Sequence, residues 1–137
     1  MDINDSLQDL LFSFSSIIRK IARKKSISFS NAIILLSISS RGIIISQLSN
    51  KLGIDKTTMT RNLARLESQN LIIIIKNKND IRSKLIYTSK KGDTLVSFLN
   101  KEINKKLKSI FNQLSHDEYE NTINSLSSLS WSFINEK

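Results

Sequence analysis

The sequence predicts a mainly helical chain that carries one small antiparallel sheet. Apolar residues recur at three- and four-residue steps near both ends of the chain, which is the spacing of amphipathic helices. Two runs of strand-forming residues, 71–75 and 85–87, flank a polar segment, which indicates a hairpin. With 137 residues, of which 39% are hydrophobic and 24% charged, the chain is long enough for one compact subunit.

A long amphipathic helix is expected over residues 4–24. Its apolar positions are Leu7, Leu10, Phe14, Ile18 and Ile21. Basic residues gather near its end, in the segment 19–25. Such cations can form a solvated last turn that matches the helix dipole, or they can contact a phosphate, and the sequence leaves both interpretations open. A long helix at the end of so small a chain favours packing against a second subunit.

A shorter helix is expected over residues 29–39, with the hydroxyl of Ser28 as its N-cap. The inward side chains would be Ala32, Ile33 and Leu36. Residues 41–42 should end this helix. The β-branched run 43–45 is too short for a helix, so it predicts a third strand beside the hairpin.

Two short helices around a tight turn are expected next. Leu48 and Leu52 form one apolar stripe at i, i+4, and Ser46 is the expected N-cap of that helix. Gly53 follows, which suits a left-handed residue that ends a helix, and Asp55 then stands at the N-cap of the second helix. A turn of about three residues between two helices is typical of a helix-turn-helix.

The second helix separates apolar from polar residues. Its inward side chains are Met59, Leu63 and Leu66. Its outward or peripheral side chains are Lys56, Thr57, Thr58, Thr60, Arg61 and Arg65. Hydroxyls and arginines without carboxylates suit the major groove of DNA, because they can bond base edges and phosphates. The positive N-terminus of the helix would add a phosphate site.

A hairpin with a basic end follows. Asn70 tolerates a left-handed backbone, residues 71–75 form the first strand and residues 85–87 the return strand. The polar segment between them, 76–84, is expected to be the tip. It carries Lys76, Lys78, Arg82 and Lys84 against Asp80 alone. Such a wing can enter the minor groove of DNA, whose negative potential attracts arginine.

The C-terminal part predicts two more helices. Ser89 should cap a helix of about 35–40 Å, and Ser115 with Glu118 has the form of a capping box that opens the last helix. The first stripe is Leu95, Leu99, Ile103, Leu107, Ile110 and Leu114, and the second is Tyr119, Ile123, Leu126 and Phe133. Trp131 and Phe133 would be exposed in a monomer, so we expect them at a subunit boundary; the alternative is a loosely ordered tail.

At these residues the chain resembles the MarR family of winged helix-turn-helix transcriptional regulators. The resemblance is carried by the sequence LGIDKTTMTR over 52–61, by Asp80 and Arg82 in a D-x-R spacing, and by TSKKG over 88–92. It implies that Thr57, Thr58, Thr60 and Arg61 meet the major groove, that Arg82 enters the minor groove, and that Asp80 orients the wing. The chain departs from the family pattern at Asn70, where glycine is usual, and in a wing rich in Lys and Asn.

The resemblance also implies an architecture. Residues 29–92 would be a winged helix-turn-helix lobe, and the helices of 1–28 and 93–137 would form a dimerisation lobe in which two subunits interlock. A regulatory pocket is implied where the first, second and fifth helices meet the winged lobe, with an anionic or phenolic ligand. Binding without any ligand remains an alternative.

Several other classes of function find little support. His116 is the only histidine, there is no cysteine, and the twelve carboxylates are scattered, so we expect neither an enzyme nor a metal or cofactor site. Without cysteine a thiol switch is excluded. The longest apolar runs have five residues and the N-terminus resembles no signal peptide, so we expect a cytoplasmic protein without a membrane contact.

The expected function is that of a transcriptional regulator that binds double-stranded DNA sequence-specifically, with repression as the expected effect. It would act as a homodimer on a pseudo-palindromic site. A net charge of +9 agrees with a polyanionic partner. The expected DNA-binding residues are Lys56, Thr57, Thr58, Thr60, Arg61, Arg65, Lys78, Asp80, Arg82 and Lys84. The alternative is an architectural protein that coats DNA with little sequence preference or docks onto another protein.

Overall fold

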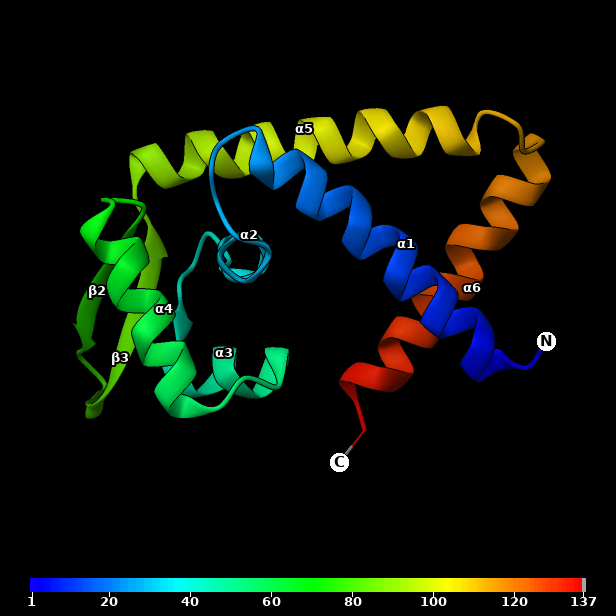
Figure 1. Ribbon diagram of the computed structural model, residues 1–137. Coiled ribbons are helices and arrows are strands. Elements are labelled where there is room, and N and C mark those ends of the chain that lie inside the picture. Colours follow the sequence, from blue (N-terminus) through cyan, green and yellow to red (C-terminus); the bar gives the residue numbers. More distant parts are fainter. Residues whose placement is uncertain (137) are drawn as a thin grey trace. The chain divides into compact units, whose positions relative to one another are not determined.

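The computed structural model describes residues 1–136. Its elements are α1 (Ile3–Arg23), α2 (Phe29–Ser37), β1 (Ile43–Ile44), α3 (Ile45–Leu52), α4 (Lys56–Ser68), β2 (Ile72–Asn77), β3 (Asp80–Thr88), α5 (Lys90–Phe111) and α6 (His116–Ile134) (Figure 1). The predicted class, mainly helical with a small antiparallel sheet, is confirmed. The chain divides into two compact units, one from Met1 to Ile103 and one from residue 104 on, and each is described by itself.

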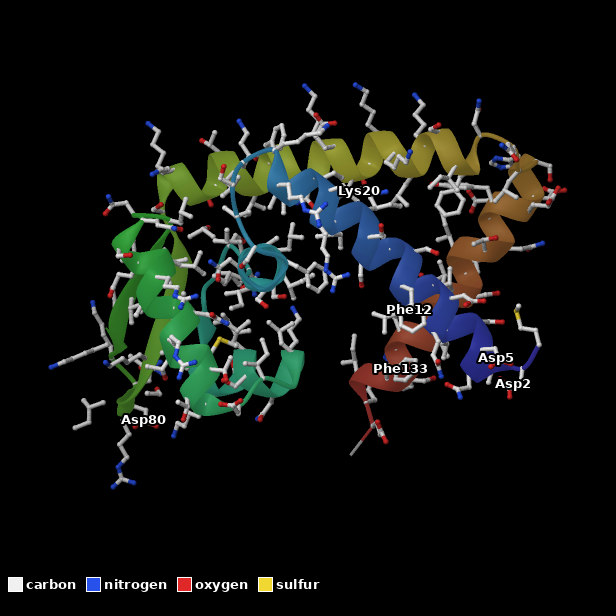
Figure 2. The ribbon with its side chains drawn as sticks, viewed as in Figure 1. Asp2, Asp5, Phe12, Lys20, Asp80 and Phe133 are labelled. Carbon is white, nitrogen blue, oxygen red and sulfur yellow. The ribbon has the colours of Figure 1, made fainter. Side chains whose placement is uncertain are left out.

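Helix α1 begins with a capping box that the sequence analysis did not identify. The Asp5 N–H donates to Asp2 at 2.9 Å, and the Asp2 N–H donates to the Asp5 carboxylate at 3.3 Å (Figure 2). Near the other end of the helix, Ile18, Ile21 and Ala22 are buried. The helix is therefore fixed locally at its start and by packing at its end.

Helix α2 begins where expected, but its inward face is different. The Asn31 N–H donates to the Ser28 hydroxyl at 3.1 Å, which confirms the predicted cap. Ala32 is buried as expected, whereas the other buried aliphatic side chains are Ile34 and Leu35. Ile33 and Leu36 were expected to point inward, but both are only half-buried.

The sheet has the order β1-β3-β2 and is antiparallel throughout. The predicted third strand exists, but only Ile43 and Ile44 pair with β3, and Ile45 already starts α3. The expected Ser46 cap is therefore wrong: Ile44 occupies the N-cap position of α3 and offers no side-chain hydrogen bond.

One hydrophobic cluster joins α2, α3, α4 and the sheet. Its members are Ile34, Leu35, Leu48, Met59, Leu63, Leu66, Leu71, Ile72 and Ile86. Because α4 packs on β2, the helix-turn-helix and the hairpin form one body, and both are seen together in Figure 1. This body holds the candidate site.

The first turn of α5 is tied to the connection between α4 and β2. The Ser89 N–H donates to the Leu71 carbonyl at 3.0 Å, and the Ser89 hydroxyl donates to the Asn70 carbonyl at 2.5 Å. The Gly92 N–H donates to the Ser89 hydroxyl at 3.0 Å, which confirms Ser89 as the cap. A Cβ at Gly92 would lie 2.0 Å from the Leu71 carbonyl oxygen, so only glycine fits there. Asn70 has φ +60°, the left-handed backbone that was expected.

The second unit contains the end of α5 and all of α6. The Glu118 N–H donates to the Ser115 hydroxyl at 3.2 Å and the Ser115 N–H to the Glu118 carboxylate at 3.5 Å, so the predicted capping box is confirmed. The rings of Phe111 and Tyr119 meet edge to face, with centroids 6.1 Å apart. Over residues 1–136, no helix combines the length and the apolar character that crossing a membrane requires.

Candidate nucleic-acid interface

A three-residue turn separates α3 from α4, as predicted. Gly53 has φ +63°, so it ends α3 in the left-handed conformation that glycine adopts without strain. Asp55 is the N-cap of α4: one carboxylate oxygen accepts from the Thr58 N–H and the other from the Thr58 hydroxyl, both at 2.8 Å. The carboxylate thus takes one of the free N–H groups at the positive end of α4, where a phosphate site was expected.

The Asp55 cap predicts a pH dependence of stability. Hydrogen bonds from the Thr58 N–H and hydroxyl lower the pKa of Asp55 below its ordinary value. Since the pKa is lower in the folded state, this stabilisation is present above about pH 4, the unfolded pKa, and is lost as pH falls through the folded pKa. We expect Asp55→Ala to lower the Tm at neutral pH, and the difference from the wild type to shrink at about pH 3, as measured by circular dichroism.

Asp55→Asn is the matched control for this prediction, because asparagine also caps helices but does not titrate. Asp55→Asn should retain most of the Tm that the wild type has at neutral pH. The part of the pH dependence of Tm that comes from Asp55 should be absent in this variant. A Tm difference between the wild type and Asp55→Ala that stays constant over this pH range would contradict the role of the carboxylate.

The two faces of α4 are divided as the sequence predicted. Met59, Leu63 and Leu66 are buried, with at most 2% of each side chain exposed. The side chains exposed on the other face are Lys56, Thr57, Thr60, Arg61 and Arg65, while Thr58 is half-buried. The buried residues hold α4 against the core, so its outward side chains start from a rigid backbone.

The three threonines of α4 differ in what their hydroxyls can offer. The Thr58 hydroxyl donates to Asp55, and the Thr60 hydroxyl donates to the Lys56 carbonyl at 2.8 Å. Both can still accept a hydrogen bond, but their protons are engaged. Thr57 is exposed, and within residues 1–136 its hydroxyl, unlike those of Thr58 and Thr60, makes no hydrogen bond, so its proton can be donated to a base or a phosphate.

The two strands of the hairpin are longer than predicted. Strand β2 continues to Asn77 and β3 begins at Asp80, so the turn proper is Lys78 and Asn79. The expectation that 76–84 is all tip was therefore wrong, because most of these residues belong to the strands. Lys76 pairs directly with Lys84 across the two strands.

The end of the wing is shaped by short polar contacts. The Asp80 carboxylate accepts from the Arg82 N–H at 3.0 Å, and the Asn77 amide donates to the Ser83 hydroxyl at 2.9 Å. Asp80 lies at the end of the hairpin in Figure 2. Between Asp80 and Lys84, three residues of β3 have no counterpart on β2. Such an irregularity turns side chains away from the sheet. Asn77 and Ser83 were not identified from the sequence, since polar residues in a hairpin give no local signal of such pairing.

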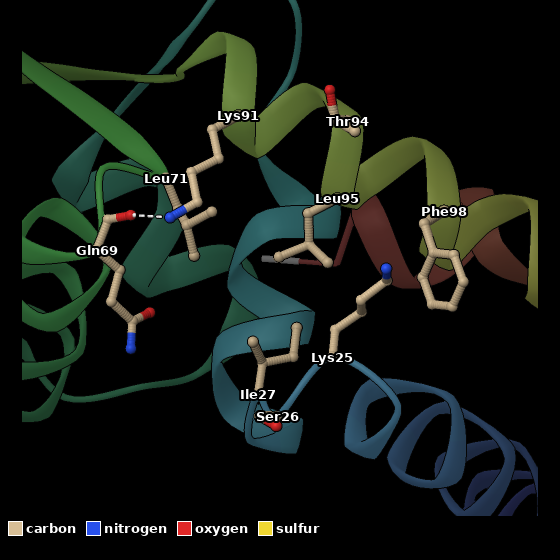
Figure 3. Close-up of a pocket in the computed structure, with 9 residues that line it drawn as sticks. All are labelled: Lys25, Ser26, Ile27, Gln69, Leu71, Lys91, Thr94, Leu95 and Phe98. Atoms are coloured by element: carbon tan, nitrogen blue, oxygen red, sulfur yellow. Dashed lines mark hydrogen bonds between the residues drawn. The ribbon is translucent and has the colours of Figure 1, made fainter.

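A cavity of about 440 Å³ lies beside the start of α5. It is lined by residues of the α1–α2 connection, of the α4–β2 connection and of α5 (Figure 3). The Lys91 ammonium donates to the Gln69 carbonyl at 3.1 Å, and the Lys25 ammonium lies 4.5 Å from the centre of the Phe98 ring. The cavity therefore combines two cations with an aromatic ring and aliphatic walls.

The described residues contain no cluster of side chains that could hold a metal ion. Across 1–136, no three side chains of the His, Asp and Glu types lie close enough together to hold a metal ion. His116 is exposed at the first position of α6. The helix-turn-helix of α3 and α4 and the wing of β2 and β3 together define a winged helix-turn-helix protein.

Comparison with known proteins supports this class. Residues 33–84 match the sequence model of the MarR family. Apo MarR from E. coli superposes with a TM-score of 0.80 at 18% identity, covering 94% of this chain and 96% of that one. A SlyA-like transcription regulator from Listeria monocytogenes gives 0.82 at 24% identity, covering 97% and 89%. An E. coli MarR mutant complexed with operator DNA gives 0.74 at 19% identity, covering 93% and 92%.

The predicted resemblance to the MarR family is thus confirmed: residues 33–84 match that family, and the chain has the fold of its transcriptional regulators. No protein of curated function matches the chain in sequence.

Proposed function

We propose that this protein is a homodimeric, sequence-specific DNA-binding regulator of transcription, and a repressor where its site overlaps a promoter. The outward side chains of α4 would enter the major groove, with Thr57 and Arg61 at base edges and Lys56 and Arg65 at phosphates. Thr58 and Thr60 would accept hydrogen bonds or offer methyl groups. Arg82 would enter the minor groove, with Lys78 and Lys84 on the backbone and Asp80 as the residue that holds the wing.

One observation carries this proposal: cations face each other on the wing without a carboxylate to balance them. Lys76 lies directly opposite Lys84, an arrangement that costs stability in an isolated sheet. In residues 1–136 the one ion pair within 4.0 Å joins Lys24 to Glu102, so neither lysine of the wing has such a partner. Since α4 packs on this same sheet, phosphates of a duplex would relieve the repulsion on the wing while α4 occupies the adjacent groove.

Footprinting of a genomic DNA library at two salt concentrations tests the proposed function. A regulator should protect a few sites that persist at high salt, whereas an architectural coating protein should give broad protection that disappears. Two half-sites about 10 base pairs apart are expected if a dimer places its two α4 helices in successive major grooves. Broad, salt-sensitive protection alone would exclude the sequence-specific regulator.

Apolar side chains at both ends of the chain favour a second copy as partner. On α1, Leu11 and Phe12 are each 61% exposed, and on α6, Trp131 and Phe133 are 68% and 59% exposed. Large apolar side chains as exposed as these, on each of the two helices, are typical of interaction surfaces.

At micromolar concentration we expect sedimentation equilibrium to give twice the chain mass of 15.6 kDa. Phe12→Ser should shift the equilibrium toward single chains, while Ile73→Ser, at an exposed position on the sheet, should not. A single-chain mass for the wild type at every concentration would contradict the dimer.

A small anionic aromatic compound is the ligand that the cavity beside α5 fits best. Its Lys25 and Lys91 ammonium groups can pair with a carboxylate, and Leu95 and Phe98 can pack on a ring. We expect some members of a panel of aromatic acids to raise the Tm by mass action, and their neutral amides to leave it unchanged.

Lys25→Met should abolish this rise in Tm, while Lys101→Met, on the exposed face of α5, should preserve it. If no acid raises the Tm of the wild type, the protein is a regulator that binds DNA without such a ligand.

A further inference from the structure

Among the large hydrophobic side chains of the wing, one is far more exposed than the others. Ile81 lies between Asp80 and Arg82 and is 86% exposed. It belongs to the three residues of β3 that have no counterpart on β2, so the irregularity of the strand directs it away from the sheet. The backbone around it is held by the hydrogen bond from the Arg82 N–H to Asp80. An apolar side chain is therefore presented on a fixed support at the end of the hairpin.

The charges around Ile81 restrict what can cover it. Lys78, Arg82 and Lys84 are exposed on the same hairpin. The carboxylate of Asp80 already accepts the Arg82 N–H. A purely apolar partner would have to desolvate these cations, whereas a polyanion would be attracted by them. The occupant must therefore bring negative charge close to a small apolar surface.

The minor groove of A·T-rich DNA has both properties. Its walls carry phosphates, and where it is narrow its negative potential attracts arginine. Its floor presents only acceptors at A·T pairs, whereas a G·C pair adds the N2 amino donor of guanine. An isoleucine over that amino group would bury a donor without a partner, which is costly. Apolar side chains are known to enter the minor groove between base steps.

Resting on the proposed DNA-binding function, we propose that Ile81 is a specificity-determining residue that packs into the minor groove beside Arg82 and selects A·T over G·C pairs there. Arg82 supplies the charge attraction and Ile81 the discrimination. The preference arises from the absence of the guanine amino group, so an inosine·cytosine pair should be accepted as well as an A·T pair.

The test uses duplexes that carry the strongest footprinted site, with the minor-groove pairs protected by the wing set to A·T, I·C or G·C. For the wild type we expect similar Kd values on A·T and I·C and a Kd about tenfold higher on G·C. Ile81→Ser should weaken binding to A·T and I·C about tenfold, bring the three Kd values together, and leave the salt slope unchanged. Arg82→Ala should instead reduce the salt slope by about one.

Ile73→Ser is the matched control, because it removes a half-exposed isoleucine of the same hairpin away from its end. It should bind as the wild type does. Ile81→Ser binding with the wild-type Kd values, or weakened equally on all three duplexes, would overturn the role of Ile81 while the proposed function stands. A wild type without any sequence-specific footprint would overturn the proposed function, and the role of Ile81 with it.

Discussion

Arg61→Ala is expected to weaken binding to the footprinted site by about 1–3 kcal/mol, or about 5- to 150-fold in Kd. Arg61 is exposed on α4, two residues after the buried Met59 and two before the buried Leu63, so its position on the outward face is fixed by packing. An arginine in the major groove bonds guanine through two parallel hydrogen bonds, which alanine cannot replace. The preference at one base position should therefore relax, as measured by Kd values on a set of single-base variants of the site.

Lys78→Ala is the contrasting variant for this prediction. Lys78 is exposed in the turn of the wing, where its flexible ammonium suits a phosphate and carries no sequence information. It should weaken binding to all sequences alike and reduce the salt slope by about one. If Arg61→Ala and Lys78→Ala both left binding unchanged, the face of α4 and the wing would not be the DNA-binding surface.

Gly92→Ala is expected to cost about 3 kcal/mol of stability, at the upper end of what overpacking costs. The added Cβ would lie 2.0 Å from the Leu71 carbonyl oxygen and 3.3 Å from the Thr88 side chain. The Cβ would be attached to the backbone of the first turn of α5, and the oxygen it meets belongs to the backbone just before β2. Neither can therefore move aside as a flexible side chain would. Chemical denaturation monitored by circular dichroism should show the loss as a lower midpoint.

Gly53→Ala separates this steric effect from the general cost of replacing a glycine. Gly53 has φ +63°, but nothing lies within 4 Å of its added Cβ. It should therefore cost only the backbone strain of about 1–2 kcal/mol. Equal losses in the two variants would show that the contact between Gly92 and Leu71 is not what limits the stability.

The helix-turn-helix was predicted well because its signals are local and independent of one another. Gly53, Asp55 and the spacing of Met59, Leu63 and Leu66 each require a particular backbone or face, and all agree. The division of α4 into a buried and an outward face follows from these residues alone. Whether that outward face binds DNA is not a property of local spacing, so its residues remain a proposal.

The predictions for α2, β1 and the start of α3 were wrong in detail because neighbouring residues there are too similar to mark a face or a boundary. Residues 32–36 are apolar without interruption, so the sequence does not show which of them face the core; Ala32, Ile34 and Leu35 do. In the run 43–45 all residues are isoleucine, and only the pairing with β3 determines that the strand ends at Ile44. The Ser46 cap was predicted from residue type, but the helix had already begun at Ile45.

The lengths of the two wing strands were underestimated for a related reason. Both faces of the hairpin end are exposed, so its strands need no alternation of apolar and polar residues and resemble a loop in sequence. The contact of Asn77 with Ser83 lies at a strand irregularity that has no local signal in the sequence. The cavity is likewise assembled from three segments distant in sequence, which no local pattern could have brought together.

The bonds between the start of α5 and residues 69–71 restrict how this protein can respond to any signal. The Lys91 ammonium, the Ser89 hydroxyl and the Ser89 N–H hold three successive carbonyls just after the last turn of α4. Helix α4 therefore cannot rotate independently of the start of α5 without breaking these bonds. In the proposed dimer, a change in the distance between the two α4 helices would require the start of each α5 to move with its α4.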